Sequence, residues 1–114
     1  MNSAEFRKEI LKIMPGYAWT VHTSRYPEMY LSATGIQSRG FNRLSTLMIE
    51  RREKNRVVLY EVKSSGFGKK TPWLSKAEGA TLARALRSLQ SHYESMAQIY
   101  SSNASYLQNA RVKA

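Results

Sequence analysis

The sequence predicts an α+β domain in which a short helix precedes a four-stranded antiparallel sheet and a long helix follows it. Three observations support this prediction. The chain has 114 residues, which is the size of one domain. Its middle part alternates apolar and polar residues with a period of two, whereas both flanking segments repeat apolar residues every three or four positions. Because the predicted strands follow one another without helices between them, we expect them to pair in antiparallel fashion.

The first helix is predicted over residues 3–14. Phe6, Ile10 and Ile13 recur at helical spacing and form one apolar face. Ser3 is suited to cap the first turn, and Pro15-Gly16 is expected to end the helix.

Four strands are predicted within residues 17–64. They span residues 17–22, 30–37, 44–51 and 56–64. In the last of them, Val58, Tyr60 and Val62 fall on one face and alternate with more polar positions. The polar turn at residues 53–55 predicts that the third and fourth strands form a hairpin.

The long helix is predicted over residues 75–101, and residues 102–114 are expected to form a polar tail, with extension of the helix through Tyr106 and Leu107 as the alternative. Ser75 and Glu78 have the spacing of a capping box. The apolar residues that follow form a heptad pattern of nearly three repeats: Leu82, Leu86, Leu89, Tyr93, Met96 and Tyr100. This seam can pack across the sheet or pair with a second copy, and we expect a homodimer.

Composition excludes several classes of protein. The chain has no Cys and no Asp, so disulfides, thiol catalysis and cysteine zinc sites are impossible. No apolar run approaches the ~20 residues of a membrane span, and the N-terminal residues lack the apolar stretch of a signal peptide. We therefore expect a cytoplasmic protein without a membrane partner, a bound metal or a cofactor.

Charge indicates the partner. Eighteen Lys and Arg against eight Glu give a net charge of +10, and residues 39–76 hold ten of these cations against three Glu. Cations bind phosphates, and aromatic rings stack on unpaired bases. The candidate phosphate contacts are Arg43, Arg51, Arg52, Arg56, Lys63, Lys69, Lys70 and Lys76, and the candidate stacking residues are Phe41, Tyr60, Phe67 and Trp73.

Two other interpretations of the basic region remain open. It can be a solvated surface around core aromatics, or it can bind an acidic protein partner. Within it, Lys69, Lys70 and Lys76 lie close to the predicted helix start at Ser75, where free backbone N–H groups favour phosphate. A plain capped helix is the alternative at that position.

The order of elements, the basic hairpin and residues 69–75 resemble a single-stranded-DNA-binding fold. That fold is shared by Whirly proteins, small transcriptional coactivators of the same type and some phage proteins. The resemblance implies a curved antiparallel sheet, pairing of helices in a dimer and binding of single-stranded DNA. Residues 66–68 together with residues 75–80 and 83–86 also resemble the last loop and helix of double-stranded-RNA-binding domains, which makes RNA a possible ligand.

One pattern indicates catalysis instead. Glu61 and Lys63 end an apolar strand and resemble the Glu-x-Lys strand of PD-(D/E)xK nucleases. The resemblance implies that Glu61 holds Mg²⁺ and that Lys63 steadies the attacking water or the phosphate. The family's upstream Asp has no match, and Glu50 is the best-placed substitute. The two histidines, His22 and His92, have no evident catalytic partners, and we expect a non-catalytic protein, with the nuclease as the alternative.

Overall fold

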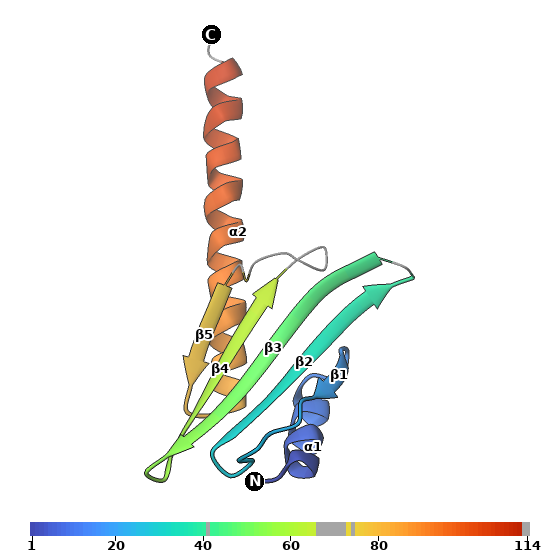
Figure 1. Cartoon of the computed structure of the whole chain (residues 1–114). Coiled ribbons are helices and arrows are strands. Elements are labelled where there is room, and N and C mark those ends of the chain that lie inside the picture. Colours follow the sequence, from blue (N-terminus) through green and yellow to red (C-terminus); the bar gives the residue numbers. More distant parts are fainter. Residues whose placement is uncertain (41, 66–72, 74, 113–114) are drawn as a thin grey trace.

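The computed structural model describes residues 1–40, 42–65, 73 and 75–112, with the backbone alone at residues 42, 43 and 112. Its elements follow the predicted α+β order, but the sheet has five strands instead of four (Figure 1). In chain order they are α1 (Ser3–Ile13), β1 (Ala18–Val21), β2 (Tyr30–Arg39), β3 (Asn42–Lys54), β4 (Val57–Ser65), β5 (Ser75–Gly79) and α2 (Leu82–Val112).

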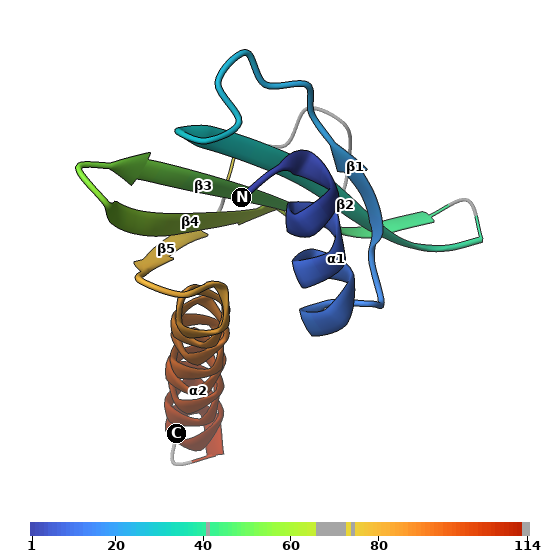
Figure 2. The same ribbon diagram turned by 90° about the horizontal axis from the view of Figure 1, so that it is seen from below.

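The sheet has the simplest possible topology. Its spatial order is β1-β2-β3-β4-β5, and each strand pairs in antiparallel fashion with its neighbour in the chain. Both helices lie on the same side of the sheet, α1 near β1 and α2 near β5 (Figure 2). We call this side the helix face, and the opposite side, over which neither helix lies, the open face.

The core lies between the helix face and the two helices. Strand alternation sends Leu31, Ile49 and Val62 to this face, where they are completely buried. Phe6 and Ile10 of α1 and Leu82, Ala85 and Leu89 of α2 complete the cluster. Part of each predicted apolar face therefore supplies the core, whereas Ile13, Tyr93 and Tyr100 are exposed.

The first turn of α1 is capped by Asn2 rather than by Ser3. The Asn2 side chain accepts a hydrogen bond of 2.8 Å from the Glu5 backbone N–H, and the Glu5 side chain bonds the Asn2 backbone in return. The prediction of Ser3 was wrong by one position, because Ser3 already belongs to the helix.

Residues 75–79 form β5 instead of the predicted helix start. Lys76 and Glu78 alternate with Ser75, Ala77 and Gly79, a period-two pattern that lets the segment pair with the edge of β4. The helix begins later, at Leu82, where the Thr81 hydroxyl accepts a hydrogen bond from the Arg84 N–H. The predicted capping box, and with it a phosphate site at a helix start near Ser75, was wrong.

Helix α2 is also longer than predicted, because it continues to Val112 instead of fading at residue 101. Its last turns project beyond the sheet (Figure 1). The radius of gyration is accordingly 17.6 Å, against ~13 Å for a compact domain of this length. Across the described residues, neither helix combines the length and the apolar character that a membrane span needs.

The hairpin of β3 and β4 closes through a two-residue turn. Asn55 and Arg56 both have positive φ angles, 53° and 65°. This conformation matches the twist of the flanking strands but strains side chains that carry a Cβ, Asn least. The predicted hairpin is therefore present, with its turn at residues 55–56.

Candidate nucleic-acid interface

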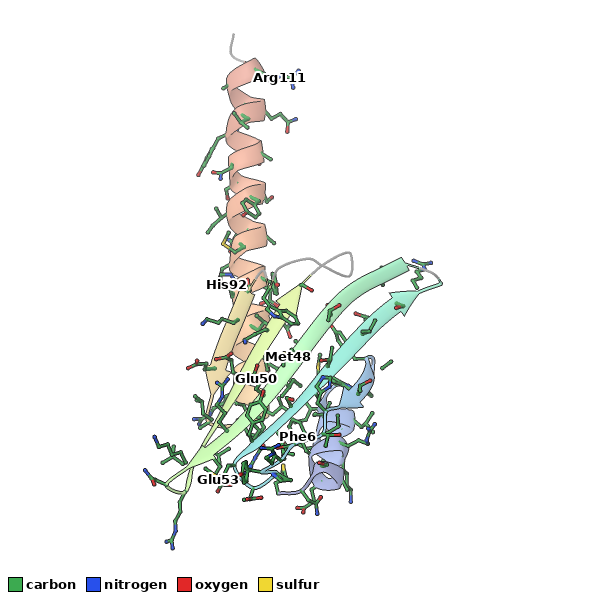
Figure 3. The ribbon with its side chains drawn as sticks, in the orientation of Figure 1. Phe6, Met48, Glu50, Glu53, His92 and Arg111 are labelled. Atoms are coloured by element: carbon green, nitrogen blue, oxygen red, sulfur yellow. The ribbon has the colours of Figure 1, made fainter. Side chains whose placement is uncertain are left out.

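The open face carries the alternate side chains of β3, β4 and β5 that point away from the helix face, and two of them, Glu50 and Glu61, are buried. Glu50 and Glu61 lie directly opposite each other in the pairing of β3 with β4, and Lys63 and Lys76 do so in the pairing of β4 with β5. Figure 3 shows Glu50 and Met48 on the central part of β3. The charged residues at the centre of this face thus come from three adjacent strands.

Lys63 sits between the two central carboxylates. Its Nζ lies 3.3 Å from Oε1 of Glu50 and 3.2 Å from Oε1 of Glu61. Arg52 bonds Glu50 as well, and its Nη1 lies 3.7 Å from Oε2 of Glu61. Two cations and two carboxylates therefore form a network that is neutral in sum.

The network shifts two pKa values in opposite directions. Burial raises the pKa of Glu61, but hydrogen bonds with Lys63 and Glu78 and the charges of Lys63 and Arg52 outweigh it, so that the pKa lies below its ordinary value. The hydrogen bond to Glu61 raises the pKa of Lys63, burial opposes it, and Glu50 adds to the rise. Both shifts favour the ionised pair.

Beside this network the open face is hollowed. Lys63, Trp73, Ser75 and Lys76 line a depression of about 430 Å³ where β5 begins. Trp73 is 43 % exposed, and Lys76 is exposed as well. Among the described residues no carboxylate pairs with Lys76, so its charge stands open to solvent next to an aromatic ring.

Two predicted contacts lie on the helix face instead. Tyr60 and Arg51 are opposite each other in the sheet and only 6 % and 8 % exposed. The Arg51 guanidinium lies 5.9 Å from the Tyr60 ring centre and pairs with Glu53 at 3.5 Å. Burial and a hydrogen bond with Glu9 raise the pKa of Tyr60 to about 12, against the effect of Arg51. Both residues belong to the core, and a ligand on the open face does not reach them.

The remaining predicted contacts are dispersed. Arg52 lies on the open face within the ion-pair network. Arg56 is exposed at the hairpin turn, at the end of β4 remote from Lys63. Several predicted positions fall outside the described residues, or at Arg43 outside the described side chains: Phe41, Arg43, Phe67, Lys69 and Lys70.

One aromatic residue of the open face was missed by the sequence analysis. Tyr30 is the partner of Arg52 in the pairing of β2 with β3, and its ring centre lies 5.9 Å from the Arg52 guanidinium. It is 37 % exposed. The signal was present in the alternation with the buried Leu31, which places Tyr30 on the face opposite the core.

The three residues of the nuclease alternative do come together. However, the Lys63 ammonium occupies the space between Glu50 and Glu61, where a metal ion shared by these carboxylates would have to lie. In the described part of the chain, no three His or Glu side chains gather in a way that fits a metal ion. The arrangement is that of a structural ion-pair network.

Comparison of the chain with family models, with curated proteins and with solved structures found no match. The site must therefore be interpreted from its own geometry.

Proposed function

We propose that this is a non-catalytic protein that binds single-stranded nucleic acid, DNA in preference to RNA, on the open face of its sheet. The observation that carries the proposal is the hollow shared by Trp73, Lys76 and Lys63. An exposed indole beside an unneutralised ammonium group provides a stacking surface and a phosphate contact within one nucleotide's reach.

The three side chains have different roles in this proposal. Trp73 stacks on an unpaired base, which duplex DNA does not offer. Lys76 contacts a phosphate. Lys63 forms the wall of the hollow, and its charge is largely neutralised by the ion pairs with Glu50 and Glu61.

The overall charge of +10 supports a polyanionic partner, because it attracts nucleic acid from a distance. Lys69 and Lys70 lie four and three residues before Trp73 in the sequence, and we include them as phosphate contacts on that ground. Arg51 and Tyr60 are left out because they are buried.

The test is a fluorescence-anisotropy titration with labelled oligo-dT, matched duplex DNA and duplex RNA, at low and moderate salt. We expect tight binding of oligo-dT with a steep salt dependence. Trp73→Ala should weaken binding of oligo-dT more than binding of the duplexes. Tyr26→Ala removes an aromatic ring that is also exposed, at 57 %, but lies in the connection before β2, and it should leave all three affinities unchanged.

Other outcomes would overturn the proposal. Equal and weak binding of all three probes would indicate that the charge serves an acidic protein partner. Preference for duplex RNA would favour the resemblance to double-stranded-RNA-binding domains. Shortening of the probe that requires Mg²⁺, and that Glu61→Gln abolishes, would establish the nuclease.

A further inference from the structure

The C-terminal half of α2 exposes an apolar stripe. Ile99, Tyr100, Tyr106 and Leu107 are all at least half exposed, Leu107 the most at 71 %. Among the described residues, Figure 3 shows no other helix or strand beside the last turns of α2, which end near Arg111. With Met96 and Asn103, these four residues form what we call the α2 stripe. It continues the heptad positions of Leu82 and Leu89, which are buried against the sheet.

This half of the helix has little intrinsic stability. Six of the sixteen residues from 95 to 110 are Ser or Asn, which favour helices only weakly. None of the sixteen is charged, so that no ion pair between successive turns stabilises this half of the helix. Isolated helices of this length are marginal in water even with favourable sequences. The stripe therefore needs a surface to pack against.

The helix face of the sheet provides a groove of matching character. Between the end of α1 and the first half of α2 lies an apolar cavity of about 430 Å³, lined among others by Met14, Tyr17, Leu44, Leu86 and Tyr93. A second depression of about 400 Å³ continues it along Ile13, Leu86 and Arg87. Together they border α2 from Ala83 to Glu94, which is roughly 16 Å of helix.

We propose that the α2 stripe of one copy packs into this groove of a second copy, and reciprocally, so that two α2 helices pair in antiparallel orientation. The proposal does not depend on nucleic-acid binding. An antiparallel partner is required because the groove borders the first half of α2, whereas the stripe lies on the second half.

Charge favours a second copy as the occupant. Two chains of net charge +10 repel each other over most of their surfaces. Residues 95–110 contain no charged side chain, so contact through them brings no like charges together. Antiparallel pairing also leaves the two basic sheets at opposite ends of the helix pair.

The test is sedimentation equilibrium of the full chain and of two double variants. Ile99→Glu with Leu107→Glu places charges in the stripe, and Gln98→Glu with Ser105→Glu places the same charges on the opposite side of the helix. We expect a dimer whose dissociation constant the stripe variant raises by roughly a hundredfold or more, and the control variant by less than about threefold. Since these side chains are exposed, circular dichroism should show folded sheets in both variants. A monomeric wild-type chain, or equal effects of the two variants, would overturn the proposal.

Orientation is tested by cross-linking, for which the cysteine-free chain is well suited. A short bismaleimide should join a Leu107→Cys chain to a Gln90→Cys chain, because Gln90 lines the groove. It should join two Leu107→Cys chains poorly. Efficient linkage between two Leu107→Cys chains, without the mixed product, would indicate parallel helices and would overturn the packing of the stripe into the groove.

Discussion

Lys63 and Lys76 are direct cross-strand neighbours on the open face, where β4 pairs with β5. Like charges in this position destabilise a sheet. Glu50 on β3 and Glu61 on β4 compensate the charge of Lys63 and leave Lys76 unneutralised among the described residues. The pair is thus unfavourable for folding and favourable for an anion beside Trp73.

Replacement of Lys76 should separate binding from stability. Lys76→Ala removes one phosphate contact, so the slope of the logarithm of affinity for oligo-dT against the logarithm of salt concentration should flatten by about one. The free energy of unfolding should stay constant or rise by a few tenths of a kcal/mol, because a like-charge pair is lost. Lys8→Ala, on the exposed side of α1, is the control and should leave the slope unchanged. Equal flattening in both variants would mean that Lys76 acts only through net charge.

The ion-pair network predicts how stability depends on pH. The pKa of Glu61 is lower in the folded chain than in the unfolded one, so its contribution is present above the ordinary pKa and is lost as pH falls through the folded value. The pKa of Lys63 is raised, so its contribution is lost as pH rises through the folded value. Lys63→Met removes the strongest hydrogen bond that lowers the pKa of Glu61, so that burial raises this pKa. Glu61 is then protonated at higher pH, and acid unfolding should begin at higher pH. Tryptophan fluorescence during acid titration measures this, with Lys54→Met, an exposed lysine that appears in none of the ion pairs of the described residues, as control. An unchanged midpoint would contradict the assignment.

Gly35 is required by the ring that covers it. It is the cross-strand partner of Trp19, and a Cβ at this position would lie 2.7 Å from Cζ3 of the indole. The indole cannot easily move, because its N–H donates a hydrogen bond of 2.9 Å to the Met14 carbonyl. Gly35→Ala should therefore destabilise the fold by ~1–3 kcal/mol in urea unfolding. At Gly16 a Cβ would meet nothing within 4 Å, and Gly16→Ala should be nearly neutral. If both variants cost the same, the close approach is not the cause.

A substitution in the hairpin turn between β3 and β4 should stabilise the chain. Arg56 has a φ of 65°, a conformation that glycine adopts without strain. Arg56→Gly should stabilise the chain by ~0.5–1 kcal/mol, measured by thermal unfolding. Arg56→Ala removes the same charge but keeps the Cβ, and it should give no such gain. An equal gain in stability in both variants would mean that loss of the charge, and not relief of backbone strain, is the cause.

The strands that the sequence predicts are those in which period-two alternation coincides with β-favouring residues. Residues 75–79 fit two patterns at once, because Ser75 and Glu78 have capping-box spacing while Lys76 and Glu78 alternate with smaller residues. The edge of β4, a tertiary partner, decides between them. The extension of α2 beyond residue 101 agrees with the heptad spacing, because Leu107 continues the positions of Tyr93 and Tyr100 within a polar segment.

The candidate site shows a different limit. Alternation alone predicts that Tyr60 and Glu61 point to opposite faces of the sheet, but it does not indicate which face the helices cover. The sequence therefore predicts Arg51 and Tyr60 as nucleic-acid contacts, whereas they lie buried on the helix face. Trp73 and Lys76 lie together because β5 returns along β4, and that pairing was not predicted.

The sheet order has a kinetic consequence. Since spatial order repeats chain order, every strand finds its partner through the segment that directly follows it. The shortest such segments have two residues each, one between β2 and β3 and the other the turn at Asn55 and Arg56. The entropy lost in closing each loop is correspondingly small. We expect the two hairpins that β3 makes with β2 and with β4 to form first and the outer strands β1 and β5 to add afterwards. We also expect the chain to fold faster than β-sandwiches, whose strands must find distant partners.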